Sequence, residues 1–143
     1  MNKFDFNNRT ALITGGAQGF GLDIAKKFLS FGAKVIIWDI DEQQLQLASK
    51  EINNSKLSFK QVDVSNYNQV SKAVDEITGS SKIDILINNA GNNIPEHFTK
   101  VKTKDMEYLV KINTVATFNL AQLCVLKMIK SKNRKKIGGS IVN

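Results

Sequence analysis

Short apolar runs alternate with longer stretches of helical periodicity along the whole chain. The runs are rich in β-branched residues and predict five strands, at residues 9–14, 34–39, 57–62, 83–87 and 138–143. Between them, apolar residues recur every three or four positions, which predicts helices over 19–31, after Asp41, after Ser65 and over 103 to about 131. Because strands and helices alternate through short links, the pattern predicts an α/β fold with a parallel sheet in one domain.

Two polar residues are placed to cap helices. Asp41 precedes the second helical stretch and Ser65 precedes the third, and a side-chain oxygen at such a position accepts an N–H of the first turn. The faces expected to point inward are Leu45, Ala48 and Ile52 in the second helix, and Val70, Ala73, Val74 and Ile77 in the third. Gly32 is expected to end the first helix.

An amide interrupts the apolar stripe of the fourth helical stretch. The stripe comprises Met106, Leu109, Val110, Thr117, Leu120 and Cys124, and Asn113 lies on it. A buried amide needs hydrogen-bond partners. Asn113 is therefore expected either to hold a water or bend the helix, or to be a core asparagine that protein groups satisfy.

Four glycines in seven residues separate the first strand from the first helix. Glycine lets the main chain turn tightly and approach a ligand without a Cβ in the way, and a helix start offers unpaired N–H donors. The stretch predicts a dinucleotide phosphate site made by Gly15, Gly16, Ala17, Gln18, Gly19, Phe20 and Gly21. The alternative is an ordinary strand-to-helix turn, since the spacing differs from the general Gly-x-Gly-x-x-Gly fingerprint.

An acidic residue ends the second strand. Asp39 follows Gly21 by 18 residues, close to the spacing at which dinucleotide-binding folds place an acid that accepts bonds from the adenosine ribose hydroxyls. A carboxylate there repels a 2′-phosphate, so Asp39 favours NAD over NADP as the cofactor. The alternative is a solvated loop acid next to the helix cap.

The ends of the third and fourth strands carry further candidates. Asp63 could accept from the exocyclic amine of adenine while Val64 packs on its ring. After the fourth strand, Asn89 is expected to tie down main chain, and Ala90 and Gly91 leave room for a ribose. The alternative at both places is a turn built from residues that favour turns. These positions belong together because ligands of such sheets bind beyond the carboxyl ends of the strands.

The formal net charge of +7 comes from one segment of the chain. Six basic residues and no acidic ones lie within residues 127–136, and without them the charge would fall from +7 to +1. Cations there complement a helix C-terminus. No nucleic-acid recognition motif accompanies the segment, so no nucleic-acid partner is expected.

Several other kinds of site are not expected. Cys124 is the only cysteine and His97 the only histidine, so there is no disulfide and no pair with metal-ligand spacing. His97 is expected at the surface and Cys124 in the core. No apolar run approaches the ~20 residues that span a bilayer, and the first ten residues carry no apolar leader, so we expect no membrane partner and a cytoplasmic location.

Taken together, these motifs make the sequence similar to the short-chain dehydrogenase/reductase family from about residue 8 to 143. The family's Thr-Gly-x-x-x-Gly-x-Gly motif matches residues 14–21, its strand-two acid matches Asp39, and its Asp-Val matches residues 63–64. Its Asn-Asn-Ala-Gly matches residues 88–91, its helix-four asparagine matches Asn113, and its fifth strand begins like residues 138–143.

The resemblance implies a fold, a reaction and an assembly. It implies a Rossmann-like, doubly wound parallel sheet of five strands in the order 3-2-1-4-5, forming an NAD(P)-binding domain over residues 1–143. It implies hydride transfer between nicotinamide and a small alcohol or ketone, a homo-oligomer, and a role for Asn113 in holding a water of the proton relay. Gln18 is neutral where NADP-using members often carry a basic residue, which agrees with NAD.

The sequence departs from the family in its reactive groups. The family uses a serine beyond the fifth strand and a Tyr-x-x-x-Lys on the next helix. Tyr67 is followed four residues later by Ser71, and Tyr108 by Ile112, so neither forms that motif. We therefore expect a sheet incomplete on its C-terminal side and a chain that holds the dinucleotide-binding half. Alone, it would be an inactive NAD-binding fragment, with an open sheet edge and an uncovered apolar helix face.

Overall fold

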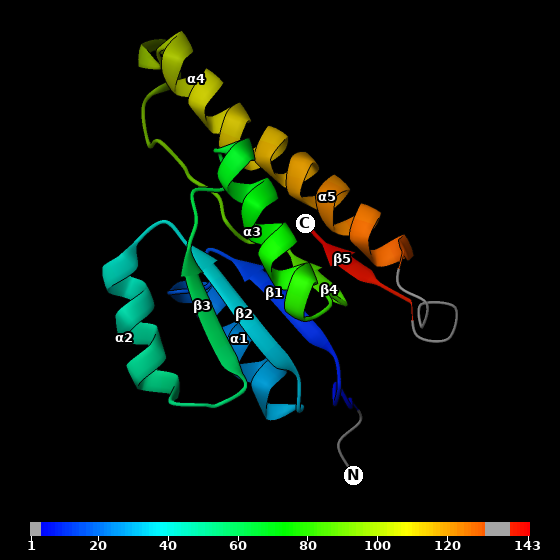
Figure 1. Ribbon diagram of the computed structural model, residues 1–143. Helices are drawn as coiled ribbons and strands as arrows, with labels where there is room; N and C mark the ends of the chain where they lie inside the picture. Colours follow the sequence, from blue (N-terminus) through cyan, green and yellow to red (C-terminus); the bar gives the residue numbers. More distant parts are fainter. Residues whose placement is uncertain (1–3, 131–137) are drawn as a thin grey trace.

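The computed structural model describes residues 4–130 and 138–143 and contains one parallel sheet of five strands. The strands are β1 (Thr10–Thr14), β2 (Lys34–Asp39), β3 (Leu57–Gln61), β4 (Ile85–Ile87) and β5 (Ser140–Val142). Their order across the sheet is β3-β2-β1-β4-β5 (Figure 1). The predicted α/β fold and strand order are confirmed, and element ends differ from the prediction by one or two residues, where helices and strands fray.

The centre of the sheet is β1, which pairs with β2 on one side and β4 on the other. Thr10 to Thr14 lie opposite Lys34 to Trp38, and Ala11 lies opposite Ile85. Every residue of β1 is buried, because a parallel strand of this kind has helices over both faces. The strand order reverses between β1 and β4, so the sheet opens there at its carboxyl end.

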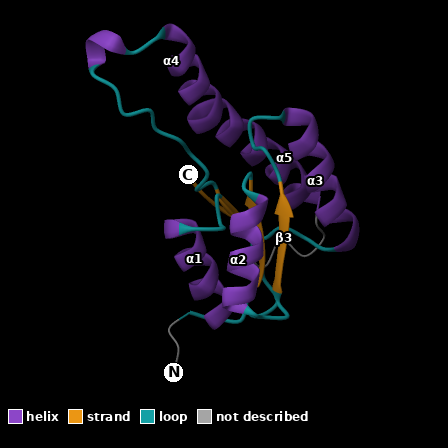
Figure 2. Ribbon diagram, turned by 90° about the vertical axis from the view of Figure 1, so that its left-hand side faces the viewer, coloured by secondary structure: helices purple, strands orange, loops and turns teal. Residues whose placement is uncertain are grey.

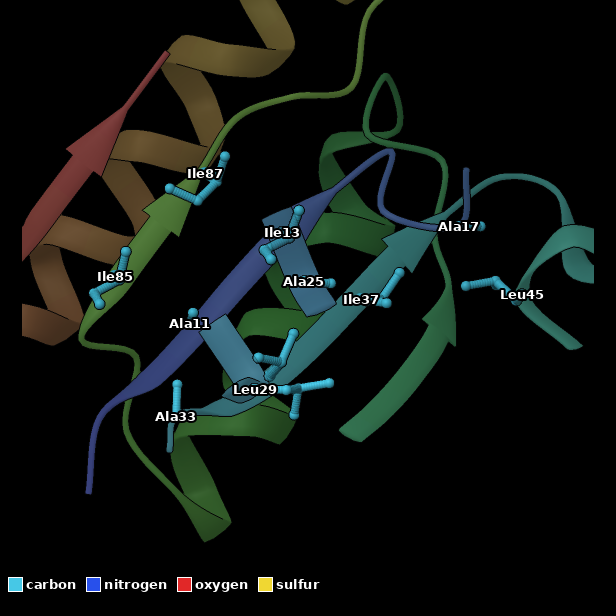
Figure 3. Packing of buried hydrophobic residues seen from close by; sticks show 11 residues of the cluster. Ala11, Ile13, Ala17, Ala25, Leu29, Ala33, Ile37, Leu45, Ile85 and Ile87 are labelled. Atoms are coloured by element: carbon cyan, nitrogen blue, oxygen red, sulfur yellow. The ribbon is translucent and has the colours of Figure 1, made fainter. Parts of the chain in front are cut away.

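Two helices cover each face of the sheet. On one face, α1 (Gly19–Ser30) and α2 (Glu42–Ile52) pack against Ala11 and Ile13 (Figure 3). On the other face, α3 (Tyr67–Ser80) and α5 (Thr117–Lys130) pack against Leu12. Successive residues of β1 thus feed two separate apolar cores, as the alternation of side chains along a strand requires.

One of the two predicted helix caps is confirmed and the other is wrong. Asp41 caps α2, and its side chain accepts the N–H of Gln44 at 3.0 Å. The cap of α3 is Asn66, not Ser65, and Asn66 accepts the N–H of Gln69 at 3.1 Å. The main-chain N–H of Ser65 is bound by the Asp63 carboxylate at 2.8 Å, and this turn starts the helix one residue later than predicted.

The predicted inward faces of these helices are largely confirmed. Leu45 and Ala48 of α2 are buried, and so are Val70, Ala73 and Val74 of α3. The last apolar position of each helix, Ile52 in α2 and Ile77 in α3, is only partly buried against its core.

A single long helical segment runs from α4 (Thr103–Val110) through a π-helical stretch (η2, Lys111–Ala116) into α5, after a short 3-10 turn (η1, Phe98–Lys100). The α5 part of this segment packs as predicted, with Leu120 and Cys124 fully buried. The α4 part does not pack on the sheet, because it projects beyond it (Figures 1 and 2). Met106 is 49% exposed there, so the apolar stripe is uncovered at this end, in line with the expected uncovered helix face.

This helix also meets the length and composition of a membrane span. Thr103–Lys130 spans 28 residues and contains an 18-residue window of mean hydropathy 1.4, of which 17% is buried. The sequence has no uninterrupted apolar run of this length, because polar residues such as Lys111 and Asn113 divide it. Three residues of this helix, Leu120, Cys124 and Met128, nevertheless pack into the core that contains Leu12 of the sheet.

Candidate functional site

The glycine loop between β1 and α1 is tight because it presses against the end of β4. Gly15 and Gly19 have φ values of +61° and +55°, in the left-handed region that favours glycine. A Cβ on Gly15 would lie 2.9 Å from the Ala90 Cα, and one on Gly21 would lie 2.2 Å from the Gly15 carbonyl oxygen. A Cβ on Gly19 would meet nothing within 4 Å, so the loop is open on that side.

The first turn of α1 differs from those of α2 and α3 because no side chain caps it, and it carries no acidic residue. Within residues 4–130 and 138–143, the N–H groups of Gly19, Phe20 and Gly21 have no hydrogen-bond partner. Two neighbouring amides are committed to protein atoms. Gly16 donates to the Trp38 carbonyl oxygen at 3.2 Å, and Ala17 donates to the Asp39 carboxylate. The free donors of the predicted phosphate loop are therefore concentrated at the helix start, where an anion is favoured.

Asp39 ends β2 with its side chain directed at the glycine loop. One carboxylate oxygen accepts the Ala17 N–H at 3.1 Å and the other accepts the Asp41 N–H at 3.2 Å. The residue is only 8% exposed, so these bonds hold a charged group in a fixed orientation. Each oxygen keeps a further lone pair with which it can accept a bond from a ligand.

The Asn-Asn-Ala-Gly segment after β4 ties the glycine loop to the sheet. Asn89 Nδ2 donates to the carbonyl oxygens of Thr14 at 3.1 Å and Gly15 at 2.9 Å. The Ala90 N–H donates to Thr14 Oγ1 at 3.0 Å. Asn89 thus fastens main chain at the strand end, as the sequence predicts.

Asn113 is exposed rather than buried, which corrects the prediction from the apolar stripe. Its amide clamps the loop after β4: Oδ1 accepts the Asn92 N–H at 2.9 Å and Nδ2 donates to the Asn92 carbonyl oxygen at 2.9 Å. Asn113 lies in the π-helical stretch, so the regular helix is disturbed at this residue. Because Asn113 is exposed, its amide finds its partners in the loop instead of the core.

These elements enclose a cleft of about 310 Å³ at the carboxyl ends of the strands. Among the predicted cofactor residues, those that line it are Gly15, Gln18, Asp39, Asp63, Val64, Asn89, Ala90 and Gly91. The predicted residues that do not line it are Gly16, Ala17, Gly19, Phe20, Gly21 and Asn113. The cleft therefore extends from the ends of β2 and β3 to the loop after β4 and the long helix, and the free amides of α1 lie outside its lining.

Comparison with known proteins identifies the family. A family model described as short chain dehydrogenase matches residues 9–143. The chain belongs to the short-chain dehydrogenase family. It is 32% identical over 140 residues to a 3-oxoacyl-(acyl-carrier-protein) reductase of Chlamydia muridarum, covering 95% of this chain and 54% of that protein. It is 37% identical over 142 residues to a short chain dehydrogenase/reductase of Gibberella zeae. This match covers 96% of this chain and 51% of that protein.

Solved short-chain dehydrogenases share this fold at similar coverage. A structure from Novosphingobium aromaticivorans superposes with a TM-score of 0.90 at 30% identity, covering 97% of this chain and 52% of that one. A gluconate 5-dehydrogenase of Burkholderia cenocepacia, in complex with NADP and tartrate, superposes with a TM-score of 0.80 at 30% identity. This match covers 90% of this chain and 51% of that chain. The chain spans about half the length of the curated relatives it matches.

Six residues line the cleft without having been predicted: Trp38, Ile40, Val62, Asn92, Tyr108 and Ile112. The sequence carried a signal for most of them. Trp38 and Ile40 flank Asp39, Val62 precedes Asp63, and Ile112 precedes Asn113. Asn92 directly follows Gly91 in the same way, whereas Tyr108 had no such signal, because it approaches the cleft from α4.

The remaining candidate groups of the chain lie away from the cleft. Cys124 is buried, and burial raises the pKa of its thiol to about 12, so the thiol stays protonated. His97 is an exposed loop residue whose Nδ1 lies 2.9 Å from Thr99 Oγ1. No group of three metal-ligating side chains occurs in the described part of the chain.

The basic segment of residues 127–136 lies mostly outside the described residues. Of its described members, Lys127 forms an ion pair with Asp75 at 2.5 Å, and Lys130 is exposed at the end of α5. One of its charges is thus engaged within the protein.

Proposed function

We propose that this chain is the dinucleotide-binding part of an oxidoreductase that transfers hydride between nicotinamide and a small alcohol or ketone, with NAD preferred over NADP. The observation that carries the proposal is the pairing of unpartnered amides at the start of α1 with a buried carboxylate across the loop. The residues fit the cofactor. An open side at Gly19 and three free donors suit a diphosphate, and Asp39 suits a ribose that carries two free hydroxyls.

Each protein group has a defined task in this proposal. Gly19, Phe20 and Gly21 would bind the diphosphate, and Asp39 would accept from the ribose hydroxyls. Asp63 and Val64 would hold adenine, and Ala90 and Gly91 would leave room for the second ribose. When bound, the nicotinamide supplies the hydride donor or acceptor.

Asn113 would keep both a structural and a relay task. Its amide oxygen and nitrogen each bind Asn92, and each retains one further hydrogen-bonding position. A relay water can therefore be held without breaking the clamp on the loop after β4. The family's tyrosine and lysine would complete the relay, and these 143 residues contain no Tyr-x-x-x-Lys.

A second candidate function follows from that missing motif. We propose that the 143 residues alone bind the dinucleotide without turning over a substrate. An assay of NAD reduction with a panel of small alcohols, and of NADH oxidation with ketones, separates the two functions. Robust turnover by this chain would contradict the second candidate, while cofactor binding without turnover would support it.

Two further properties belong to the same proposal. Cys124 is a free thiol, which suits a reducing compartment, so we place the protein in the cytoplasm. Its partners would be the dinucleotide, a small alcohol or ketone, and further copies of the chain, with neither nucleic acid nor membrane among them.

The cofactor preference is tested by calorimetric titration of the chain with NAD and NADP. We expect NAD to bind at least about tenfold more tightly, because the Asp39 carboxylate repels a 2′-phosphate. The matched variant is Asp39→Asn, whose amide oxygen can still accept the Ala17 N–H while the charge is removed. This variant should bind NAD about tenfold more weakly and lose most of the discrimination. Tighter binding of NADP by the unmodified chain would contradict the role of Asp39.

A further inference from the structure

The loop after β4 and the helix α4 meet at the rim of the cleft through a chain of hydrogen bonds. Asn113 binds both main-chain polar groups of Asn92 at 2.9 Å. The side chain of Asn92 then turns to α4, where Nδ2 donates to the Tyr108 hydroxyl oxygen at 3.2 Å. Asn92 and Tyr108 both line the cleft, so this chain of bonds fixes a phenol at its wall.

The direction of the Asn92–Tyr108 bond decides what the phenol can do. A tyrosine hydroxyl has one proton to donate and can also accept. Because it accepts from Asn92, its own proton remains available, and among the described residues it has no other hydrogen-bond partner. Tyr108 is 44% exposed, so a ligand in the cleft can reach the hydroxyl without a rearrangement of the core.

The composition of the cleft indicates which part of a ligand would meet Tyr108. The cleft lies beside β2 and β3, where Asp39 and Asp63 offer carboxylate oxygens that can only accept. Tyr108 and Ile112 are one helical turn apart and both line it, so α4 and η2 supply a wall with a hydrogen-bond donor. A nucleoside offers both donors and acceptors, and such a site would satisfy both.

We propose that Tyr108 is a cofactor-contacting residue whose hydroxyl, oriented by Asn92, donates a hydrogen bond to an acceptor atom in the adenosine half of the dinucleotide. This inference rests on the proposed function of the cleft. Tyr108 is not the proton-donating tyrosine implied by the resemblance, since Ile112 stands where a lysine would be required. Its contribution is affinity for the cofactor.

The test is calorimetric titration of the chain with NAD and with ADP-ribose, which lacks the nicotinamide. Tyr108→Phe removes the donor and keeps the ring, and we expect both ligands to bind about threefold to tenfold more weakly, by the same factor. Tyr67→Phe is the matched control, because Tyr67 is the only other tyrosine, is 48% exposed and does not line the cleft. It should bind both ligands like the unmodified chain.

A second variant tests the orienting role of Asn92. Asn92→Asp places a carboxylate that accepts the phenol proton, and also adds a charge near the cofactor. The added charge weakens cofactor binding whether or not the phenol hydroxyl is present. The loss of the phenol proton to the new carboxylate, in contrast, requires the hydroxyl of Tyr108. Asn92→Asp should therefore weaken ADP-ribose binding by a larger factor in the unmodified chain than in the Tyr108→Phe background.

The outcomes separate this inference from the proposed function. If the unmodified chain binds neither NAD nor ADP-ribose, both are overturned together. If it binds them and Tyr108→Phe binds equally well, or if only NAD binding is weakened, the role of Tyr108 is overturned and the cofactor site stands. Equal effects of Asn92→Asp in the two backgrounds would overturn the orienting role. Far-UV circular dichroism of each variant checks that the fold is retained.

Discussion

At the scale of single residues, the site depends on side chains that serve the protein and the proposed ligand together. Asp39 braces the glycine loop through Ala17 and starts the turn toward α2 through Asp41. The same carboxylate lines the cleft. A charge held by two main-chain donors needs no reorganisation when a ligand arrives, which supports the proposed role of Asp39 in selecting between two cofactors.

Cys124 shows the opposite case, a reactive group that burial makes inert. Its thiol pKa is raised from 9.0 to about 12 by burial, so the unfolded chain loses this proton at lower pH than the folded chain does. The stability that the neutral thiol contributes is complete below about pH 9 and declines as the pH rises toward 12. At pH 8 we expect iodoacetamide to leave folded Cys124 unmodified and to alkylate it rapidly in urea. Rapid alkylation of the folded chain would contradict its burial.

At the scale of elements, the glycine loop and α1 act as one unit, because Gly21 of the first turn packs on Gly15 of the loop. A Cβ at Gly21 would lie 2.2 Å from the Gly15 carbonyl oxygen and 2.6 Å from Asn89 Nδ2. The Gly15 carbonyl group belongs to the main chain, so it cannot move away from such a Cβ unless the whole loop moves. The geometry of the proposed phosphate site therefore depends on the absence of one methyl group.

Gly21→Ala is expected to lower the free energy of unfolding by about 2 kcal/mol or more and to abolish NAD binding. Gly79→Ala is the matched control, because Gly79 lies in α3 and a Cβ there would meet nothing within 4 Å. Alanine in a helix should stabilise it by about 0.5–1 kcal/mol and leave NAD binding unchanged. Chemical denaturation and calorimetry measure both effects. Normal NAD affinity in Gly21→Ala would contradict the close approach.

Elements were predictable from the sequence where local patterns determine them. The run that forms β1, the glycines before α1 and the acid that ends β2 are readable because neighbours in sequence are neighbours in the fold. The cap of α3 was displaced from Ser65 to Asn66 because a competing turn at Asp63 uses the Ser65 N–H. Periodicity placed Asn113 on a buried stripe, but it cannot show that the sheet stops short of α4.

Tyr108 and Asn92 show what the sequence could not reveal about the site. They lie 16 residues apart, on a helix and in a loop, and no motif connects them. Figure 2 shows the long loop that leads to α4. Only the path of this loop brings the two residues together at the cleft. A site built from strand ends is largely readable from sequence, whereas a wall supplied by a projecting helix requires coordinates.

At the scale of the whole molecule, the long helix has an apolar side that nothing in the described structure covers. Leu120, Cys124 and Met128 face the sheet, while exposed apolar residues recur on the remaining surface. These are Val115, Phe118, Val125, Leu126 and Ile129, of which Phe118 is 63% exposed. An exposed apolar surface of this kind is typical of a protein interface, so the molecule should associate.

Analytical ultracentrifugation should find association of the chain at micromolar concentrations. Phe118→Glu is expected to weaken association at least tenfold, because it places a charge on this apolar side. Leu47→Glu on α2 is the control, since Leu47 is 58% exposed but lies on another helix. A monomeric unmodified chain, or equal association of the Phe118→Glu variant, would contradict this view of the long helix.

The central claim is that the free amides at the start of α1 receive the diphosphate of a dinucleotide. Amide-resolved nuclear magnetic resonance during a titration with NAD tests it most directly. The account predicts that the N–H signals of Gly19, Phe20 and Gly21 shift most, while that of Gln44, already bound by the Asp41 cap, stays in place. NAD binding that leaves those three signals unmoved, or no binding at all, would contradict the account.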